Sequence, residues 1–303
     1  MNRFWVLAIL FATCSSWGTE RHFATGMVMK VDSAHNTMVV SCDPIPNYMG
    51  AMTMPFTVRQ SDGMAGLTAG KRVEFVLVVE HESYYAEHVR TVDYESVEQD
   101  PFTARRLKLQ NRLSKPSSSK ALAVGQIVPD FTLTDQARRP VTLSQFAGKV
   151  VAINFIYTSC ALPTYCFRIS NNFGVLKRRF QQHLGKDLVL LTVTFDPVRD
   201  QPEVLAHYAA TWKADPSTWH FLTGSTADVQ RVTSMFGMDV FPDEGLMNHS
   251  LHTAIIDRTG RVAANIEGNQ FTADQLADLV QTVVSPQSAA EIVDGARSQH
   301  AIK

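Results

Sequence analysis

The chain has 303 residues, of which 45% are hydrophobic and 19% charged, and its formal net charge at pH 7 is −1. This composition is typical of a globular protein, and the length allows two domains. The near-zero charge excludes an electrostatic mode of binding to nucleic acid or to an anionic membrane surface. The four cysteines are too few for a scaffold held together by disulfides.

The first residues have the pattern of an export signal. A short basic start precedes the apolar run Phe4–Ala12, and small and polar residues follow. Because this run is too short to span a bilayer permanently, we predict a signal peptide over residues 1–18, cleaved after Gly18. Cys14 lies in a degraded lipoprotein box, so a lipid anchor on this cysteine is the one expected link to a membrane. Export places the protein in an oxidising compartment such as the bacterial periplasm or cell envelope.

Residues 24–96 are predicted to form a small all-β unit. Turn signals such as Asp62-Gly63 and Ala69-Gly70 separate short runs rich in apolar and β-branched residues. Five strands in so short a stretch favour a closed or Greek-key barrel. The expected strands are Thr25–Val31, Thr37–Ser41, Thr53–Val58, Arg72–Val79 and Tyr84–Val92.

Four sulfur-bearing side chains lie close together in this unit. Met52 and Met54 share one face of an expected strand, because side chains alternate along a strand, and Cys42 and Met49 come shortly before them. Thiolate and thioether are soft ligands that select monovalent copper over zinc, calcium or magnesium. The simpler interpretation is that the methionines fill the core of a small barrel. The clustering of four sulfurs favours a copper site.

The same stretch resembles the CusF type of copper-binding domain. The motif Asp43-Pro-Ile45, followed by Met52-Thr-Met54-x-Phe56, carries the resemblance. In that family the ligands are a His before the Asp-Pro-Ile, the two methionines and a capping Trp. The resemblance therefore implies a five-stranded barrel of the OB type with Met52 and Met54 as ligands. It puts Cys42 in place of the His and Met49 where the Trp stands, and Tyr48 is the nearest aromatic residue.

Residues 97–123 are predicted to be a linker, and an α/β domain follows. The segment Lys115-Pro-Ser-Ser-Ser-Lys120 lacks apolar periodicity and has a flexible composition. Over residues 124–286 β and α patterns alternate, and residues 287–303 form a tail. Asp200 and Ser225 each precede an acidic residue by three positions and are expected to cap helices. The expected strands are Val150–Tyr157, Leu188–Phe195, Trp219–Leu222, Thr253–Ile256 and Val262–Ile266, and the expected helices are Ile169–Leu184, Pro202–Trp212, Thr226–Phe236 and Thr272–Val284.

Two cysteines mark the end of the first strand of this domain. Cys160 follows Val150–Tyr157, and Cys166 stands where the next helix begins. The N–H groups and dipole at a helix N-terminus favour thiolate over thiol, so a reactive or metal-binding pair is expected. A structural disulfide of an exported protein is the alternative. Five residues separate the cysteines, whereas two separate them in a thioredoxin C-x-x-C pair. The longer loop allows both sulfurs to bind one metal ion or to form a disulfide with each other.

His249 is the third candidate functional residue of this domain, after Cys160 and Cys166. It precedes the strand Thr253–Ile256, in an expected loop where a thioredoxin-like sheet returns the chain beside the end of the first strand. His252 is expected at the start of that strand. A lone His is more often structural, so position by itself does not assign a ligand role.

Several short motifs occur in order from Pro129 onward. Besides the two cysteines they are Pro129-Asp-Phe-x-Leu133-x-Asp135, Phe146-x-Gly-Lys149, Asn154-Phe-Ile-Tyr-Thr158, Phe195-Asp-Pro-x-Arg-Asp200-x-Pro202-Glu, Phe221-Leu-Thr-Gly224, His249-Ser and Asp257-x-x-Gly260. With these motifs the segment resembles the SCO/SenC family of copper proteins, which have a thioredoxin-like fold. The resemblance implies copper ligands at Cys160, Cys166 and His249. The chain departs from the family in its cysteine spacing, since the common pattern is C-x-x-x-C followed by Pro.

The two resemblances together imply an exported copper metallochaperone. Such a protein would assist copper insertion into the CuA centre of cytochrome c oxidase, with the CuA-bearing subunit or another exported copper or thiol protein as its partner. A thiol–disulfide oxidoreductase that uses Cys160 and Cys166 as a redox pair is one alternative. A copper-buffering or resistance protein, in which the site of Cys42, Met49, Met52 and Met54 dominates, is another.

Overall fold

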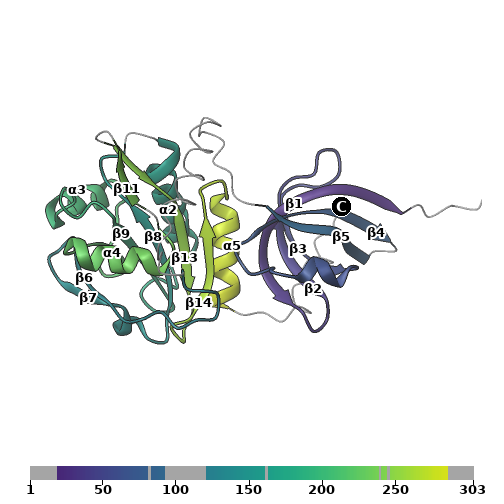
Figure 1. The fold of residues 1–303 in the computed structure, drawn as a ribbon, viewed down its shortest axis with the longest axis horizontal. Coiled ribbons are helices and arrows are strands. Elements are labelled where there is room, and N and C mark those ends of the chain that lie inside the picture. Colours follow the sequence, from purple (N-terminus) through teal and green to yellow (C-terminus); the bar gives the residue numbers. More distant parts are fainter. Residues whose placement is uncertain are drawn as a thin grey trace, which may run out of the picture.

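The structure is a computed structural model and describes residues 19–80, 83–92, 121–160, 163–238, 240–243 and 246–285. It contains an N-terminal barrel and a larger α/β unit (Figure 1). The predicted signal peptide with Cys14, most of the predicted linker 97–123 and the tail 287–303 lie outside the described residues. No helix in the described part of the chain is long and apolar enough to cross a bilayer.

The N-terminal unit is a closed barrel of five strands in the order β1-β2-β3-β5-β4. Each expected strand is present, and Met54 of the Met-Thr-Met segment lies in the barrel core. Met38, Val40 and Cys42 of β2 point into one buried cluster with Met54 and Phe56 of β3. The prediction of a small five-stranded barrel is therefore confirmed. Its strands are β1 Glu20–Asp32, β2 Thr37–Cys42, β3 Met52–Val58, β4 Arg72–Glu80 and β5 Ser83–Val92.

The second unit is built on a seven-stranded sheet in the order β14-β13-β8-β9-β10-β6-β7. Strands β8 and β9 lie at its centre, pair in parallel and are buried on both faces, as expected of continuous apolar runs between two layers of helices. The thioredoxin-like α/β prediction is confirmed. Its strands are β6 Thr132–Asp135, β7 Pro140–Thr142, β8 Val150–Ile156, β9 Leu188–Thr194, β10 Trp219–Thr223, β13 His252–Ile256 and β14 Val262–Glu267.

Four α-helices cover this sheet within the described ranges. Leu176 of α2, Leu205 of α3 and Leu276 of α5 share one buried cluster, whereas Val229 and Val232 of α4 belong to a second cluster that also holds Ile153 of β8. The helices are α2 Arg168–Arg179, α3 Pro202–Thr211, α4 Thr226–Met235 and α5 Ala273–Val284.

Three local predictions were wrong. Helix α2 ends at Arg179 instead of Leu184, and turns up to Gly185, with φ +77°, lead into β9. Asp200 does not cap α3, because Gln201 occupies the N-cap position, whereas Ser225 caps α4 as expected by accepting the Asp228 N–H. His249 lies in a strand, β12 Leu246–His249, which pairs with β11 Val240–Asp243. Strands this short carry too little alternation to be read from a sequence.

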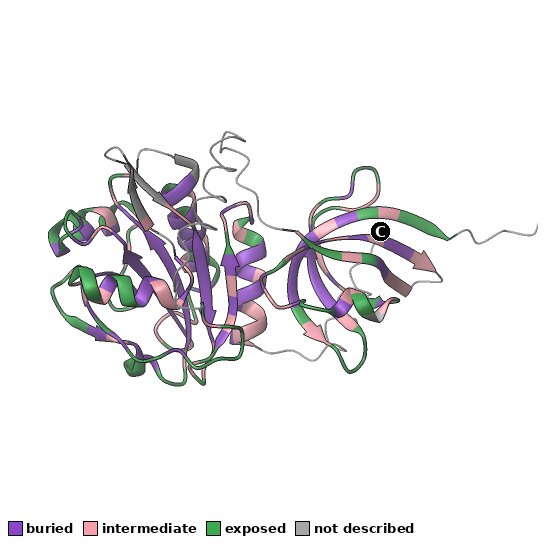
Figure 2. Ribbon diagram, in the orientation of Figure 1, coloured by how far each residue is buried: buried purple, intermediate pink, exposed green. Residues whose placement is uncertain are grey.

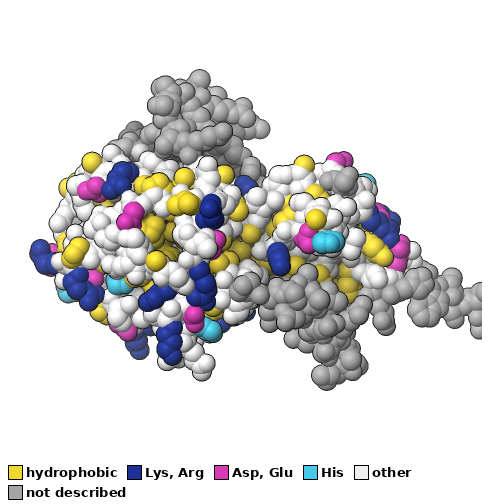
Figure 3. Space-filling model, turned by 90° about the horizontal axis from the view of Figure 1, so that it is seen from below, with side chains coloured by type: hydrophobic (Ala, Val, Ile, Leu, Met, Phe, Trp, Pro, Cys, Tyr) yellow, Lys and Arg dark blue, Asp and Glu magenta, His cyan; other side chains and the backbone are white. Residues whose placement is uncertain are grey.

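Helix α5 lies between the sheet and the barrel (Figure 1). Met27, Met29 and Val39 point out of the barrel and join the buried cluster that contains Phe271 and Leu276 of the α/β unit. Figure 2 shows buried residues on the strands on either side of this helix, and Figure 3 shows two lobes that meet at a narrow junction with hydrophobic atoms. The two units therefore share apolar surface, which stabilises their docking.

Candidate metal centres

The end of β8 is anchored by Asp200. This buried carboxylate accepts the backbone N–H of Thr158 at 3.0 Å and the hydroxyl protons of Thr158 and Thr194. Because all three donors come from the carboxyl ends of β8 and β9, Asp200 fixes the strand end from which Cys160 projects. Asp196 and Arg199, which the sequence motif also contains, form a longer ion pair of 3.8 Å with an exposed guanidinium. Asp200 is thus the residue that orients this segment, a role that its motif match did not reveal.

Cys166 lies in a single π-helical turn, Pro163–Phe167, directly before α2. Its side chain is buried, and a hydrogen bond links it to the side chain of Cys160. This hydrogen bond, followed by burial and the charge of Cys160, raises the pKa of Cys166 well above its usual range. This shift is opposite in direction to the one expected at a helix start, because the hydrogen bond with Cys160 and then burial both favour the thiol over the thiolate. Cys160 is half-buried and is the more accessible sulfur.

His249 lies against an aromatic wall. Its ring centroid is 4.5 Å from that of Phe195, 5.7 Å from that of Tyr157 and 6.5 Å from that of Tyr165. Burial lowers the pKa of His249, so the ring is neutral at pH 7, and its Nδ1 is 2.9 Å from the Ser250 carbonyl oxygen. Since a carbonyl only accepts, Nδ1 carries the proton and Nε2 keeps its lone pair, which is the form that binds metals.

Tyr157 connects the three candidate ligands. Its side chain hydrogen-bonds Cys160, its pKa is raised by burial and by both cysteines, and its ring contacts His249 edge-on. The charge of Cys160 also acts on His249. Among the described residues, however, no three His, Cys, Asp or Glu side chains form a ready metal-binding group. Cys160, Cys166 and His249 thus each interact with Tyr157.

The four sulfurs of the barrel lie on two neighbouring strands and the loop between them. Cys42 is directly opposite Met52 in the β2–β3 ladder, and Val40 is opposite Met54. Opposed residues have their Cβ atoms roughly 5 Å apart on the same face, so the thiol and both thioethers belong to one inward surface. Cys42 and Met54 are buried, whereas Met49 and Met52 are half-buried and pack on the rim of the same cluster. Burial raises the pKa of Cys42 to about 12, so it is a thiol at pH 7.

His22 is a residue that the sequence patterns did not single out. Its ring stacks on Tyr48, with the centroids 3.8 Å apart and an interplanar angle of 22°. Its Nε2 is buried without a hydrogen bond and lies 3.6 Å from Glu20 Oε2. In β1 it pairs with Leu77 of the barrel core, so it faces inward at the end of the barrel. Tyr48 of this stacked pair packs against the same buried cluster as Met49 and Met52.

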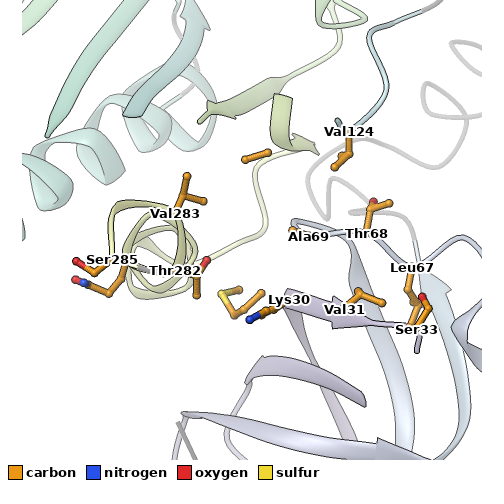
Figure 4. Close-up of a pocket in the computed structure, with 13 residues that line it drawn as sticks. Lys30, Val31, Ser33, Leu67, Thr68, Ala69, Val124, Thr282, Val283 and Ser285 are labelled. Carbon is orange, nitrogen blue, oxygen red and sulfur yellow. The ribbon is translucent and has the colours of Figure 1, made fainter. Parts of the chain in front are cut away.

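A cavity of about 430 Å³ lies between the barrel and α5 (Figure 4). Lys30, Leu67 and Thr68 line it on one side, and Val124, Thr282 and Val283 on the other. Among the described residues that line it, Met29 is the one sulfur-bearing residue and Lys30 the one charged residue. This cavity therefore lacks the soft ligand set of the two clusters described above.

Comparison with known proteins assigns both units. A family model described as SCO1/SenC matches residues 119–285, more than half of the chain, and the model of the copper binding periplasmic protein CusF matches residues 21–90. A protein of Stutzerimonas stutzeri named as copper-binding is 26% identical over 182 residues, which are 56% of this chain and 86% of that protein.

Two further similar proteins carry SCO names. The SCO1 protein homolog of Bacillus subtilis is 29% identical over 97 residues, 32% of this chain and 49% of its own length, so the match spans about half of that relative. The solved structure of Arabidopsis thaliana ScoI with copper bound has 21% identity and a TM-score of 0.47, and the match covers 54% of this chain and all of that one. The chain belongs to the SCO1/SenC family and carries a domain of the CusF type before its family domain.

Proposed function

We propose that the chain is an exported copper metallochaperone with two soft-ligand sites. Cys160, Cys166 and His249 hold copper in the α/β unit, and Cys42, Met49, Met52 and Met54 hold it in the barrel. Copper is the cargo, and the recipient is the CuA centre of cytochrome c oxidase or another exported copper or thiol protein. The observation that carries this proposal is the arrangement of His249: its protonated Nδ1 leaves the Nε2 lone pair available for a metal, and the charge of Cys160 acts on the same ring.

The chemistry of the donors supports this role. Two thiols and a neutral imidazole, like a thiol with three thioethers, prefer Cu(I) to harder cations. Both clusters contain a thiol that is protonated before metal arrives, so loading releases protons and becomes tighter as pH rises. Two sites in one docked chain also keep released copper at a high local concentration for transfer.

An anaerobic Cu(I) titration tests the assignment. We expect two equivalents for the full chain and one after Cys160→Ala with Cys166→Ala. Combining Cys42→Ser with Met52→Leu and Met54→Leu should remove the other equivalent. A stoichiometry that stays at its original value after the double cysteine change would refute the site in the α/β unit.

The contact between Cys160 and Cys166 also favours a second candidate, a thiol–disulfide oxidoreductase. The Cys160 thiolate would attack a substrate disulfide, forming a mixed disulfide and releasing one substrate sulfur as a thiolate that takes up a proton. Cys166, after losing its proton, would then attack the Cys160 sulfur and release the second substrate thiol. Two electrons pass to the substrate, and the pair ends as the Cys160–Cys166 disulfide. A Cys166→Ser variant should then trap a partner covalently.

A further inference from the structure

Helix α5 of the α/β unit forms hydrogen bonds to the polar residues that neighbour the barrel sulfurs in sequence. Ser41 and Asp43 flank Cys42 in sequence, and Thr53 stands between Met52 and Met54. Because side chains alternate along a strand, these polar residues point out of the barrel where the sulfurs point in. Each of the three outward residues is bound by α5.

Asp278 binds both ligand strands at once. Its Oδ2 accepts the Ser41 hydroxyl at 3.1 Å and the Thr53 hydroxyl at 2.8 Å. One carboxylate oxygen therefore joins β2 next to Cys42 to β3 between the two methionines. Its Oδ1 accepts from Arg179 Nη2 at 2.7 Å, which connects the same side chain to the last turn of α2.

Gln275, one turn earlier on α5, binds the residues on either side of Cys42. Its Nε2 donates to the Ser41 carbonyl oxygen at 3.3 Å and to Asp43 Oδ1 at 2.9 Å. Its Oε1 accepts the Thr272 N–H at 3.0 Å and so closes the capping box of the helix. The buried amide is thus fixed by the helix start on one side and by the barrel on the other.

Asp43 completes this connection. Its second oxygen accepts from Arg72 Nη2 at 2.7 Å and from the Thr25 hydroxyl. The carboxylate that follows Cys42 is therefore held by β1, β4 and α5 together. Moving α5 relative to the barrel would change hydrogen bonds next to three of the four sulfur ligands.

We propose that Gln275 and Asp278 are positioning residues of the barrel copper site, so that the α/β unit forms part of the support of a site it does not contain. This inference rests on the proposed function of the barrel sulfurs. Copper in the barrel and docking of α5 then strengthen each other, because a coupling between two equilibria acts equally in both directions. Helix α2, which follows Cys166, shares the connection through Arg179.

The test uses the full chain with Cys160→Ser and Cys166→Ser, so that only the barrel site binds Cu(I). Affinity is measured by competition with a chromophoric Cu(I) chelator. Asp278→Ala and Gln275→Ala should each weaken binding by about tenfold, within the range of ordinary site-to-site coupling. The Cu(I) affinity of Asp278→Asn, which keeps one acceptor oxygen, should lie between that of Asp278→Ala and that of the protein with Asp278 intact. Asp274→Ala is the matched control, because Asp274 lies on the same helix but is exposed.

Two further measurements separate positioning from general stability. X-ray absorption at the copper edge should show altered Cu–S distances in Asp278→Ala. Cu(I) added to the background protein, which is the full chain with Cys160→Ser and Cys166→Ser, should slow hydrogen exchange in α5. If both α5 variants bind copper with the background affinity and spectrum while Met52→Leu with Met54→Leu does not bind, the positioning role is wrong and the barrel site stands. If the background protein binds no Cu(I), the proposed function of the barrel is wrong.

Discussion

The Nδ1 of His249 lies 2.9 Å from the carbonyl oxygen of Ser250, the next residue in the chain. A ligating His commonly donates its other ring N–H to such an acceptor, and the bond sets both the tautomer and the ring orientation. Burial lowers the pKa of His249, so the neutral ring does not need to lose a proton when metal binds. The ring is therefore neutral with its proton on Nδ1, which is the form of imidazole that can bind a metal through Nε2.

Replacing His249 separates copper binding from thiol chemistry. His249→Ala should weaken Cu(I) binding at the α/β site by at least about tenfold, since a ligand is removed while both thiols remain. The rate of disulfide formation between Cys160 and Cys166 should stay close to that of the wild type. His207→Ala is the control, because His207 is exposed on α3. Equal copper affinity in both variants would rule out His249 as a ligand.

The two cysteines should differ in reactivity. Cys166 is buried and has a raised pKa, so it remains a thiol at pH 7.5 and reacts slowly with iodoacetamide. Cys160, which is half-buried, should be alkylated first in the reduced, copper-free protein. Mass spectrometry of peptides after timed quenching measures both rates. Faster modification of Cys166 would contradict the assignment of Cys160 as the attacking sulfur.

Removing Asp200 should loosen the strand end that carries Cys160. Asp200→Ala leaves the Thr158 N–H, the half-buried Thr158 hydroxyl and the buried Thr194 hydroxyl without their acceptor, which should lower the free energy of unfolding by about 3 kcal/mol. Urea unfolding followed by fluorescence measures the change. Arg199→Ala, which breaks only a partly exposed ion pair, should cost less than about 1 kcal/mol. Similar losses in the two variants would show that Asp200 does not anchor this end.

His220 should make the protein less stable in mild acid. Its pKa is lowered by burial, a shift that Asp135 and Asp215 oppose and that Arg139 reinforces. A histidine whose folded-state pKa is lowered contributes stability that is present above its unfolded pKa near 6.5 and is lost as pH falls below it. The loss approaches about 1.4 kcal/mol per pH unit until the folded-state pKa is reached. Unfolding midpoints between pH 7 and pH 5 should fall less in His220→Phe than in the wild type.

Gly70 tests the docking of the two units. It has φ +87°, and a Cβ there would lie 3.1 Å from Ile266 Cγ1 and 3.3 Å from the Cβ of Ala264, both on β14. Gly70→Ala should speed hydrogen exchange in β14 and α5 while the barrel core stays protected. Gly66→Ala is the matched control, because Gly66 has φ +73° and open space around its Cβ position, so it carries only the backbone cost of about 1 kcal/mol. Equal exchange in the two variants would show that β14 tolerates the added methyl group.

Much of the fold was predictable because it depends on residues close in sequence. The mainly apolar runs of β8 and β9 reflect burial of these strands on both faces, and turn signals such as Asp62-Gly63 and Ala69-Gly70 separate the barrel strands along the chain. The capping of α4 by Ser225 is equally local. The hairpin of β11 and β12 was missed, since four residues give too little periodicity to separate a strand from a loop.

The roles of Asp200 and Cys166 could not be predicted from spacing. Asp200 has the sequence pattern of a helix cap, but Gln201 occupies the N-cap position. The Asp200 carboxylate instead binds Thr158, which is 42 residues away in the chain. Cys166 has the sequence position of an activated thiol, but the hydrogen bond with Cys160 and then burial raise its pKa, opposite to the expected direction. In both cases a side-chain contact that exists only in the folded chain outweighed the effect of the local backbone.

The amino-acid sequence by itself determined the two units, the residue types of both sulfur clusters and the strands that carry them, because period and side-chain chemistry are properties of short segments. Only the tertiary structure decided which tautomer His249 adopts, which cysteine is accessible and what supports the barrel sulfurs. The contact between Ser41 and Asp278 joins residues 237 positions apart. Such a contact exists because α5 and β1 bury apolar surface together, and no periodic pattern along the chain encodes that choice.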